Sequence, residues 1–180
     1  MDNGNAISCF CNVCQSWFAG SVSSGDICPE CITNPKPAYI TYSYKTLYVL
    51  GFLFDPDHKQ VALIQKTRPD WQKGLLNGIG GKIESGETSI EAISREFKEE
   101  AGLDIKNWEY KLSMESSTWI VDVYRAESNE ILNVTTLTEE IVQVIHINSL
   151  NEYPIVPNLK WLIPLCLDNE IAPIHIIYHS

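Results

Sequence analysis

The chain has 180 residues, of which 44% are hydrophobic, and it carries a formal net charge of −10. This length suits one domain of ordinary size with a small appendage, and the apolar fraction is enough to form a packed core. The acidic balance argues against a nucleic-acid partner, because binding to nucleic acid needs a basic surface. No apolar run is as long as a membrane span and the N-terminus is polar, so we expect a cytoplasmic protein without a membrane partner.

Five of the six cysteines lie within residues 9–31. Two C-x-x-C pairs supply four thiolates with the spacing of a tetrahedral Zn²⁺ site: Cys11, Cys14, Cys28 and Cys31. Cys9 is so close to Cys11 that we treat it as a spare thiol or as a replacement for Cys11. Disulfides and an iron–sulfur cluster are the alternatives, and the reduced state of cytosolic thiols favours zinc over disulfides.

The cysteine-rich stretch resembles a zinc ribbon, and we predict a zinc-ribbon-like module over residues 1–36. A segment of about forty residues buries too little core to fold alone, so structural Zn²⁺ would supply the missing folding energy. We expect this module to have a structural role or to contact a protein partner. A stiff, proline-containing linker leads from it to a second domain, residues 37–180.

The second domain alternates between strand-like and helical patterns. We expect strands at residues 47–54, 60–66, 119–125, 141–147 and 172–178. We expect helices at about residues 88–101 and 158–167, with Pro164 near the start of the second helix or kinking it. Strands flanked by two helices predict an α/β sandwich.

The most informative pattern covers residues 81–103, where a glycine-rich loop leads into a helix with acidic residues at fixed offsets. Glu96 and Glu100 are four residues apart, so they lie on one face of the helix, and Glu99 flanks that face. Several carboxylates on one face repel each other unless a cation lies there, which favours a divalent metal. Glycines let the backbone approach a ligand closely, so the combination indicates phosphate chemistry.

The helix itself has clear start and stop signals. Thr88 or Ser89 can cap its N-terminus, and Glu91 stands where a capping box needs it. Gly102 is placed to end the helix in a left-handed conformation. The residues that we expect to face the core are Ile90, Ile93, Phe97 and Ala101.

The whole run is Gly81-x5-Glu87-x7-Arg95-Glu96-Phe97-x-Glu99-Glu100-x-Gly102-Leu103. It matches the Nudix box at every fixed position, and the chain therefore resembles the MutT/Nudix hydrolases. Phe97 fills a position that more often holds Ile, Leu or Val. The resemblance implies an α/β/α sandwich with a mixed sheet, and a pyrophosphohydrolase that acts on acid anhydrides in phosphorus-containing compounds.

The resemblance also implies roles for residues of the box. Glu96, Glu99 and Glu100 would hold Mg²⁺ or Mn²⁺ together with the carbonyl of Gly81, and Glu99 is either a ligand or the general base. Arg95 would orient the box.

We expect Arg95 to orient the box by pairing with Glu87. A further metal ligand in several Nudix relatives lies just before a strand, where this chain has Glu139 and Glu140. Glu139 is our candidate for it, and an ordinary surface turn is the alternative.

The loop Asn77-Gly78-Ile79-Gly80-Gly81-Lys82 looks like that of MutT-type enzymes, which cleave purine nucleoside triphosphates to monophosphate and pyrophosphate. In those relatives the Asn contacts the base, so Asn77 is the base-reading candidate, with a turn Asn as the alternative. Lys82, Lys66 and Arg68 are candidates for phosphate contacts.

A second tract, residues 156–164, resembles the purine-reading tract of the same relatives, but it has Val156 and Asn158 where they have Trp and Asp. This departure leaves a preference for oxidised purines open. Asn158 is a candidate for hydrogen bonding to a base edge. Trp71 and Trp161 either stack on a base or pack in the core.

Three other functions are alternatives to a MutT-type activity. A zinc ribbon ahead of a Nudix domain also occurs in NADH pyrophosphatases, but the signature that follows the box in those enzymes is missing after Leu103. Hydrolysis of ADP-ribose or an ADP-sugar is a related option. A non-catalytic binding protein on a Nudix scaffold is the alternative from another class, and the intact acidic cluster argues against it.

Overall fold

The computed structural model describes residues 7–11, 16–20, 45–171 and 173–178. At the N-terminus, β1 (Ile7–Cys11) and β2 (Ser16–Gly20) form an antiparallel hairpin in which Cys11 is opposite Ser16. The other three predicted zinc ligands, Cys14, Cys28 and Cys31, lie outside the described residues. The predicted zinc site therefore stays a prediction.

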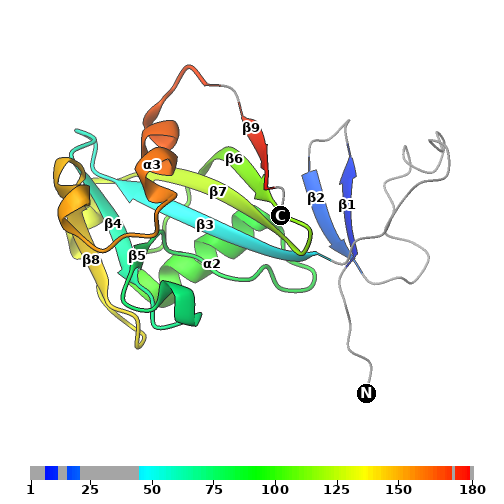
Figure 1. Cartoon of the computed structure of the whole chain (residues 1–180), viewed down its shortest axis with the longest axis horizontal. Coiled ribbons are helices and arrows are strands. Elements are labelled where there is room, and N and C mark those ends of the chain that lie inside the picture. The colour runs from blue at the N-terminus through cyan, green and yellow to red at the C-terminus, as the bar shows by residue number, and fades with distance from the viewer. Residues whose placement is uncertain (1–6, 12–15, 21–44, 172, 179–180) are drawn as a thin grey trace.

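In the rest of the described chain, seven strands form one mixed sheet (Figure 1). They are β3 (Thr46–Phe54), β4 (Gln60–Gln65), β5 (Leu76–Asn77), β6 (Glu109–Glu115), β7 (Trp119–Glu127), β8 (Val142–His146) and β9 (Ile174–Ile177). The strand order is β5-β4-β3-β7-β6-β9, and β8 pairs with β4. The β3–β7 and β6–β9 pairs are parallel and the others are antiparallel.

Two α-helices cover opposite faces of this sheet, as Figure 1 shows: α2 (Ser89–Ala101) on one and α3 (Leu159–Leu167) on the other. Ile93 and Phe97 of α2 are fully buried against the first face. Phe52 and Leu162 belong to the core on the second face. The predicted α/β/α sandwich with a mixed sheet is confirmed.

The remaining elements are three short 3-10 helices: η1 (Asp70–Gln72), η2 (Asn129–Asn133) and η3 (Ile147–Glu152). Across the described residues, no helix combines the length and the apolar character needed to cross a membrane.

Several expected elements differ from the structure in detail. Strand β6 is absent from the elements expected from the sequence. It has a charged residue, Lys111, at a buried position in its middle, and a register shift between Tyr110 and Leu112 breaks the alternation of polar and apolar residues. The Lys111 ammonium is satisfied by the carbonyl oxygen of Asp168, at 2.8 Å. A buried lysine with a specific partner looks in sequence like a surface residue.

One helix prediction is corrected and another is narrowed. Ile90 was expected in the core, but it is 45% exposed, because the buried stripe of α2 runs through Ala92, Ile93, Phe97 and Ala101. Pro164 lies inside α3, which excludes a position near the start of the helix and leaves the alternative of a kink. The proline has no N–H to donate, and its carbonyl accepts from the backbone N–H of Asp168 at the end of the helix.

Candidate functional site

Helix α2 presents the acidic face, and its two ends are fixed as the sequence predicts. The Thr88 side chain accepts from the backbone N–H of Glu91, and the Glu91 carboxylate accepts from the backbone N–H of Thr88, which completes the capping box. Gly102 adopts φ 75°, the left-handed conformation that ends the helix. The two ends of the helix are therefore fixed at Thr88 and Gly102.

The glycine loop lies directly against the acidic face of α2. A Cβ atom on Gly81 would stand 2.5 Å from a carboxylate oxygen of Glu96, so any side chain there would force the end of the Glu96 side chain to move. The backbone N–H of Gly80 points at Glu100, with 3.3 Å between the nitrogen and Oε2. The Gly81 carbonyl accepts from the backbone N–H of Val49 at 2.9 Å, which ties the loop to β3.

Arg95 connects the two ends of the box. Its guanidinium donates two parallel hydrogen bonds to Glu87, with Nε to Oε1 at 2.8 Å and Nη2 to Oε2 at 2.9 Å. The expected pairing of Arg95 with Glu87 is thus present. Nη1 donates to Glu96 at 2.8 Å and to Glu99 at 3.2 Å, so one cation organises three carboxylates. Its hydrogen bond is the main cause that lowers the pKa of Glu87.

Glu100 is in a different environment from its neighbours on the helix. Burial raises the pKa of Glu100 to about 7, the nearby Lys66 opposes this rise, and Glu96 and Glu140 add to it. The carboxyl group is therefore poorly compensated by positive charge at neutral pH. A buried acid of this kind is stabilised in its ionised form by a cation.

The carboxylate of Glu140, in the loop before β8, completes the group of acidic side chains at the site. The side chain of Glu139 is exposed, whereas Glu140 is only 8% exposed and acts electrostatically on Glu100. Two adjacent residues before a strand point to opposite sides, and the sequence does not tell which side faces α2. The structure therefore places Glu140 beside the box, and the role of Glu139 as a metal ligand stays a prediction.

The partners of Glu140 come from the end of β4. Its Oε1 accepts from the backbone N–H of Thr67 at 2.6 Å and from the Thr67 hydroxyl at 3.0 Å, and its Oε2 pairs with the Lys66 ammonium. Burial acts to raise the pKa of Glu140, but these donors prevail and the pKa is lowered. Lys66 and Thr67 are site residues whose roles the sequence did not reveal.

The donor set suits a hard divalent cation. Four carboxylates, of Glu96, Glu99, Glu100 and Glu140, meet two cations, Arg95 and Lys66, and carboxylate oxygens are the ligands that Mg²⁺ prefers. Within the described residues, no three Asp, Glu, His or Cys side chains are close enough together to form a complete metal-binding group. Arg95 pairs with Glu96 and Glu99, and Lys66 pairs with Glu140.

Two of the predicted substrate contacts lie on segments that are side by side. The backbone N–H of Leu76 donates to Pro154 at 2.7 Å, and that of Val156 donates to Leu76 at 2.9 Å. Asn77 directly follows Leu76, and Asn158 comes two residues after Val156. The fold thus joins two candidates that are 81 residues apart in the chain.

The side chains of these two asparagines differ in their hydrogen bonding. The Asn77 amide donates to Gln72 at 3.0 Å, and its oxygen accepts from the backbone N–H of Gly78 at 2.8 Å, as in a turn. Asn158 is at the N-cap of α3 without a capping bond. Its Oδ1 is buried and has no partner among the described residues.

The other candidates for substrate contact are at the surface. Lys82 and Arg68 have exposed side chains, and the Lys82 carbonyl accepts from Arg95 at 3.2 Å. Trp71, in η1, is 66% exposed, which excludes the core-packing alternative for it. Trp161 is partly buried and packs on the core under α3.

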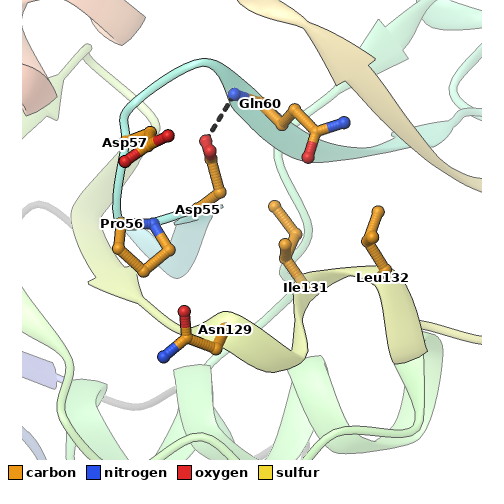
Figure 2. Close-up of a pocket in the computed structure, with 7 residues that line it drawn as sticks. All are labelled: Asp55, Pro56, Asp57, Gln60, Asn129, Ile131 and Leu132. Carbon is orange, nitrogen blue, oxygen red and sulfur yellow. Dashed lines mark hydrogen bonds between the residues drawn. The ribbon is translucent and has the colours of Figure 1, made fainter.

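A separate shallow pocket of about 240 Å³ lies at the turn between β3 and β4 (Figure 2). It is lined by Asp55, Pro56, Asp57, Gln60, Asn129, Ile131 and Leu132. The Asp55 carboxylate accepts from the backbone N–H groups of Lys59 and Gln60, so it shapes the turn. None of the box residues lines this pocket, and the candidate site is the acidic face of α2.

Comparison with known proteins agrees with this geometry. The family model of the NUDIX domain matches residues 45–166, which is more than half of the chain. The chain belongs to the Nudix hydrolase family.

Two curated Nudix relatives and one solved structure are similar to it. Human 8-oxo-dGDP phosphatase NUDT18 is 34% identical over 113 residues, which cover 62% of this chain and 34% of that protein. The mouse oxidized purine nucleoside triphosphate hydrolase is 28% identical over 103 residues, 55% of this chain and 64% of that protein. The chain thus spans less than two thirds of each of these relatives.

Among solved structures, one from a study of MutT from Aliivibrio salmonicida and Vibrio cholerae superimposes with a TM-score of 0.58 at 19% identity. The superposition covers 68% of this chain and 97% of that chain. At this identity the likeness supports the fold alone.

Proposed function

We propose that this Nudix hydrolase cleaves a nucleoside triphosphate, with a purine base, to the monophosphate and pyrophosphate. The observation that carries the proposal is the acidic face of α2, pressed against the glycine loop and organised by Arg95. Its donor set fits Mg²⁺ or Mn²⁺, and such an ion, when bound, neutralises phosphate charge and activates a water molecule.

In this proposal, Glu96, Glu99, Glu100 and Glu140 hold the metal together with the Gly81 carbonyl. Glu99, with a side chain that is 58% exposed, has room to act as a ligand or as the general base. Arg95 keeps the carboxylates in place rather than touching the substrate. Lys82 and Arg68, which are exposed beside the glycine loop and β4, would contact the phosphates.

The base would be read by the two adjacent segments that carry Asn77 and Asn158. The Oδ1 of Asn158 has no partner among the described residues, and a rotation of this side chain would present the buried acceptor to an N–H of a base edge. Trp71, largely exposed in η1, offers a face on which a base can stack. The names of the human and mouse relatives, which act on oxidised purine nucleotides, support this class of substrate.

The test is Mg²⁺-dependent hydrolysis of a panel of dNTPs, 8-oxo-dGTP, 8-oxo-dGDP, ADP-ribose and NADH, with products separated by chromatography. Monophosphate and pyrophosphate from a purine triphosphate are the expected products. Cleavage of ADP-ribose or NADH alone would replace this substrate class by a dinucleotide or ADP-sugar. Binding of a nucleotide without any turnover would instead indicate a non-catalytic binding protein.

We also infer that residues 1–36 form a separate zinc-ribbon-like module ahead of the Nudix domain. The β1–β2 hairpin supports this, because Cys11, one of the four predicted ligands, ends its first strand. Hairpins with a C-x-x-C turn are a common way to present two thiolates to one Zn²⁺.

A further inference from the structure

Lys66 is placed where a small movement of its ammonium group would affect the acidic site. Its backbone is fixed, since its N–H donates to Leu75 at 2.9 Å and its carbonyl accepts from Gly74 at 2.8 Å. Its side chain is only 15% exposed and ends on Glu140. Four rotatable carbon–carbon bonds allow the ammonium to move while the backbone stays in place.

Both carboxylate oxygens of Glu140 are already engaged by neighbouring residues. Thr67 binds Oε1 through its backbone N–H and its hydroxyl, and Lys66 binds Oε2. The two Thr67 contacts are neutral donors that orient the carboxylate. The Lys66 ammonium is the one of these partners that carries a full positive charge, so it takes the electrostatic role that a metal ion would have.

The charge of Lys66 also acts on Glu100. Lys66 attracts the Glu100 carboxylate, whereas the charges of Glu96 and Glu140 repel it. On the other side of the box, Arg95 pairs with Glu96 and Glu99. Lys66 is therefore the cation that compensates the negative charges of Glu140 and Glu100.

We propose that the Lys66 ammonium and a divalent cation compete for Glu140, so that metal binding has to open the Lys66–Glu140 pair. This rests on the proposed metal site at the box. Thr67 would keep Glu140 oriented while Lys66 leaves, and the released ammonium becomes available to a phosphate group. Lys66 thus sets the metal affinity of the site without being a ligand.

The test measures the affinity for Mn²⁺ alone, by electron paramagnetic resonance or calorimetry, without nucleotide. Lys66→Met removes the competitor and should tighten Mn²⁺ binding roughly tenfold. Lys66→Arg keeps the charge and should bind Mn²⁺ no more tightly than wild type. Lys73→Met, which removes an exposed lysine of the same segment between β4 and β5, changes net charge equally and should alter the affinity by less than about twofold.

A double variant shows whether the competition takes place at Glu140. In a Glu140→Gln background, Lys66→Met should change Mn²⁺ affinity much less than tenfold, because the contested carboxylate is gone and only the effect of Lys66 on Glu100 remains. The same background avoids leaving an unpaired buried charge, so folding is preserved if Lys66→Met alone is unstable.

Unchanged or weaker Mn²⁺ binding by Lys66→Met would overturn the proposal, as would a tenfold effect that persists with Glu140→Gln. Neither result affects the proposed hydrolase function if the wild-type protein binds Mn²⁺ and cleaves nucleotides. Absence of both Mn²⁺ binding and cleavage in the wild type would instead reject the proposed function itself.

Discussion

At the residue scale, the candidate site separates its carboxylates by their environment. Glu96 and Glu99 are bound by Arg95, Glu140 by Lys66 and Thr67, and Glu100 mainly by one backbone N–H. Burial without a close cationic partner explains why the pKa of Glu100 rises to about 7. The four acids are therefore not equivalent, although three of them look alike in the sequence.

Replacement of Glu100 by Gln should lower kcat roughly a hundredfold or more, because a buried ligand of the proposed metal is lost. The fold should remain intact, since the neutral amide suits a buried position better than an ionised carboxyl group. Steady-state hydrolysis and circular dichroism would be measured together. Near-normal turnover would contradict the assignment of Glu100, and Glu152→Gln, an exposed acid outside the box, is the control.

Asp122 is a second buried acid, and it lies outside the proposed site. It is only 4% exposed, its Oδ1 has no partner among the described residues, and burial raises its pKa to about 6 from the ordinary 3.8. Because the pKa in the folded state is the higher one, the folded protein binds this proton more tightly. The resulting stability is full below the ordinary pKa and is lost as the pH rises through about 6.

Asp122→Asn should therefore raise the free energy of unfolding by about 1–3 kcal/mol near neutral pH, since it removes a buried charge. The gain should shrink as the pH falls below about 6, where Asp122 is protonated. Urea unfolding at several pH values would measure it. A gain that does not vary with pH would show that the effect has another cause.

At the scale of elements, the site depends on the contact between the glycine loop and α2. Gly81 has no side chain, so the loop can pass directly over the Glu96 carboxylate. Arg95 fastens the same loop by its bonds to Glu87 and to the Lys82 carbonyl. Together these contacts hold the loop and the helix as one rigid surface.

Gly81→Ala should reduce activity strongly, because its Cβ would stand 2.5 Å from Glu96 and would push the carboxylate or the loop away. The free energy of unfolding should fall by only about 1–2 kcal/mol, since the clash is with the end of the flexible Glu96 side chain, which can move aside. Hydrolysis rates and thermal melts would separate the two effects. Ser85→Ala, in the exposed turn of the same loop, should leave both unchanged.

At the scale of the whole molecule, the two predicted parts have different sources of stability. The Nudix domain has a hydrophobic core on each face of its sheet. The short N-terminal part is rich in cysteine, and in our proposal it depends on a metal ion.

We therefore expect one tightly bound Zn²⁺ per chain, lost in Cys28→Ser but kept in Cys166→Ser. The control is matched because Cys166 is a buried core cysteine of α3 in the second domain. Metal analysis by mass spectrometry, together with thiol titration of the folded protein, would measure it. A folded protein with reactive thiols throughout the N-terminal part and no zinc would reject the module.

The local structure of the box could be read from the sequence to a large extent. The cap at Thr88, the end at Gly102 and the pairing of Arg95 with Glu87 all follow from short-range rules of helix geometry and charge. The helix–loop unit is contained within about twenty consecutive residues, so its contacts depend little on the rest of the chain.

Other features of the site depend on distant parts of the chain. The choice of Glu140 over Glu139 follows from how β8 pairs with β4, which brings Lys66 and Thr67 to that carboxylate. The exposure of Trp71 and the neighbouring positions of Asn77 and Asn158 also result from contacts between distant segments. No local pattern contains this information.

The sequence by itself determined the family and the acidic helix with its two ends, because these depend on residue types at fixed short spacings. The tertiary structure alone decided which loop acid joins the box, which cation compensates it and which asparagine keeps a buried acceptor. The physical reason is that electrostatic compensation and burial are set by neighbours in space. In this fold those neighbours are supplied by strands that are far apart in the chain.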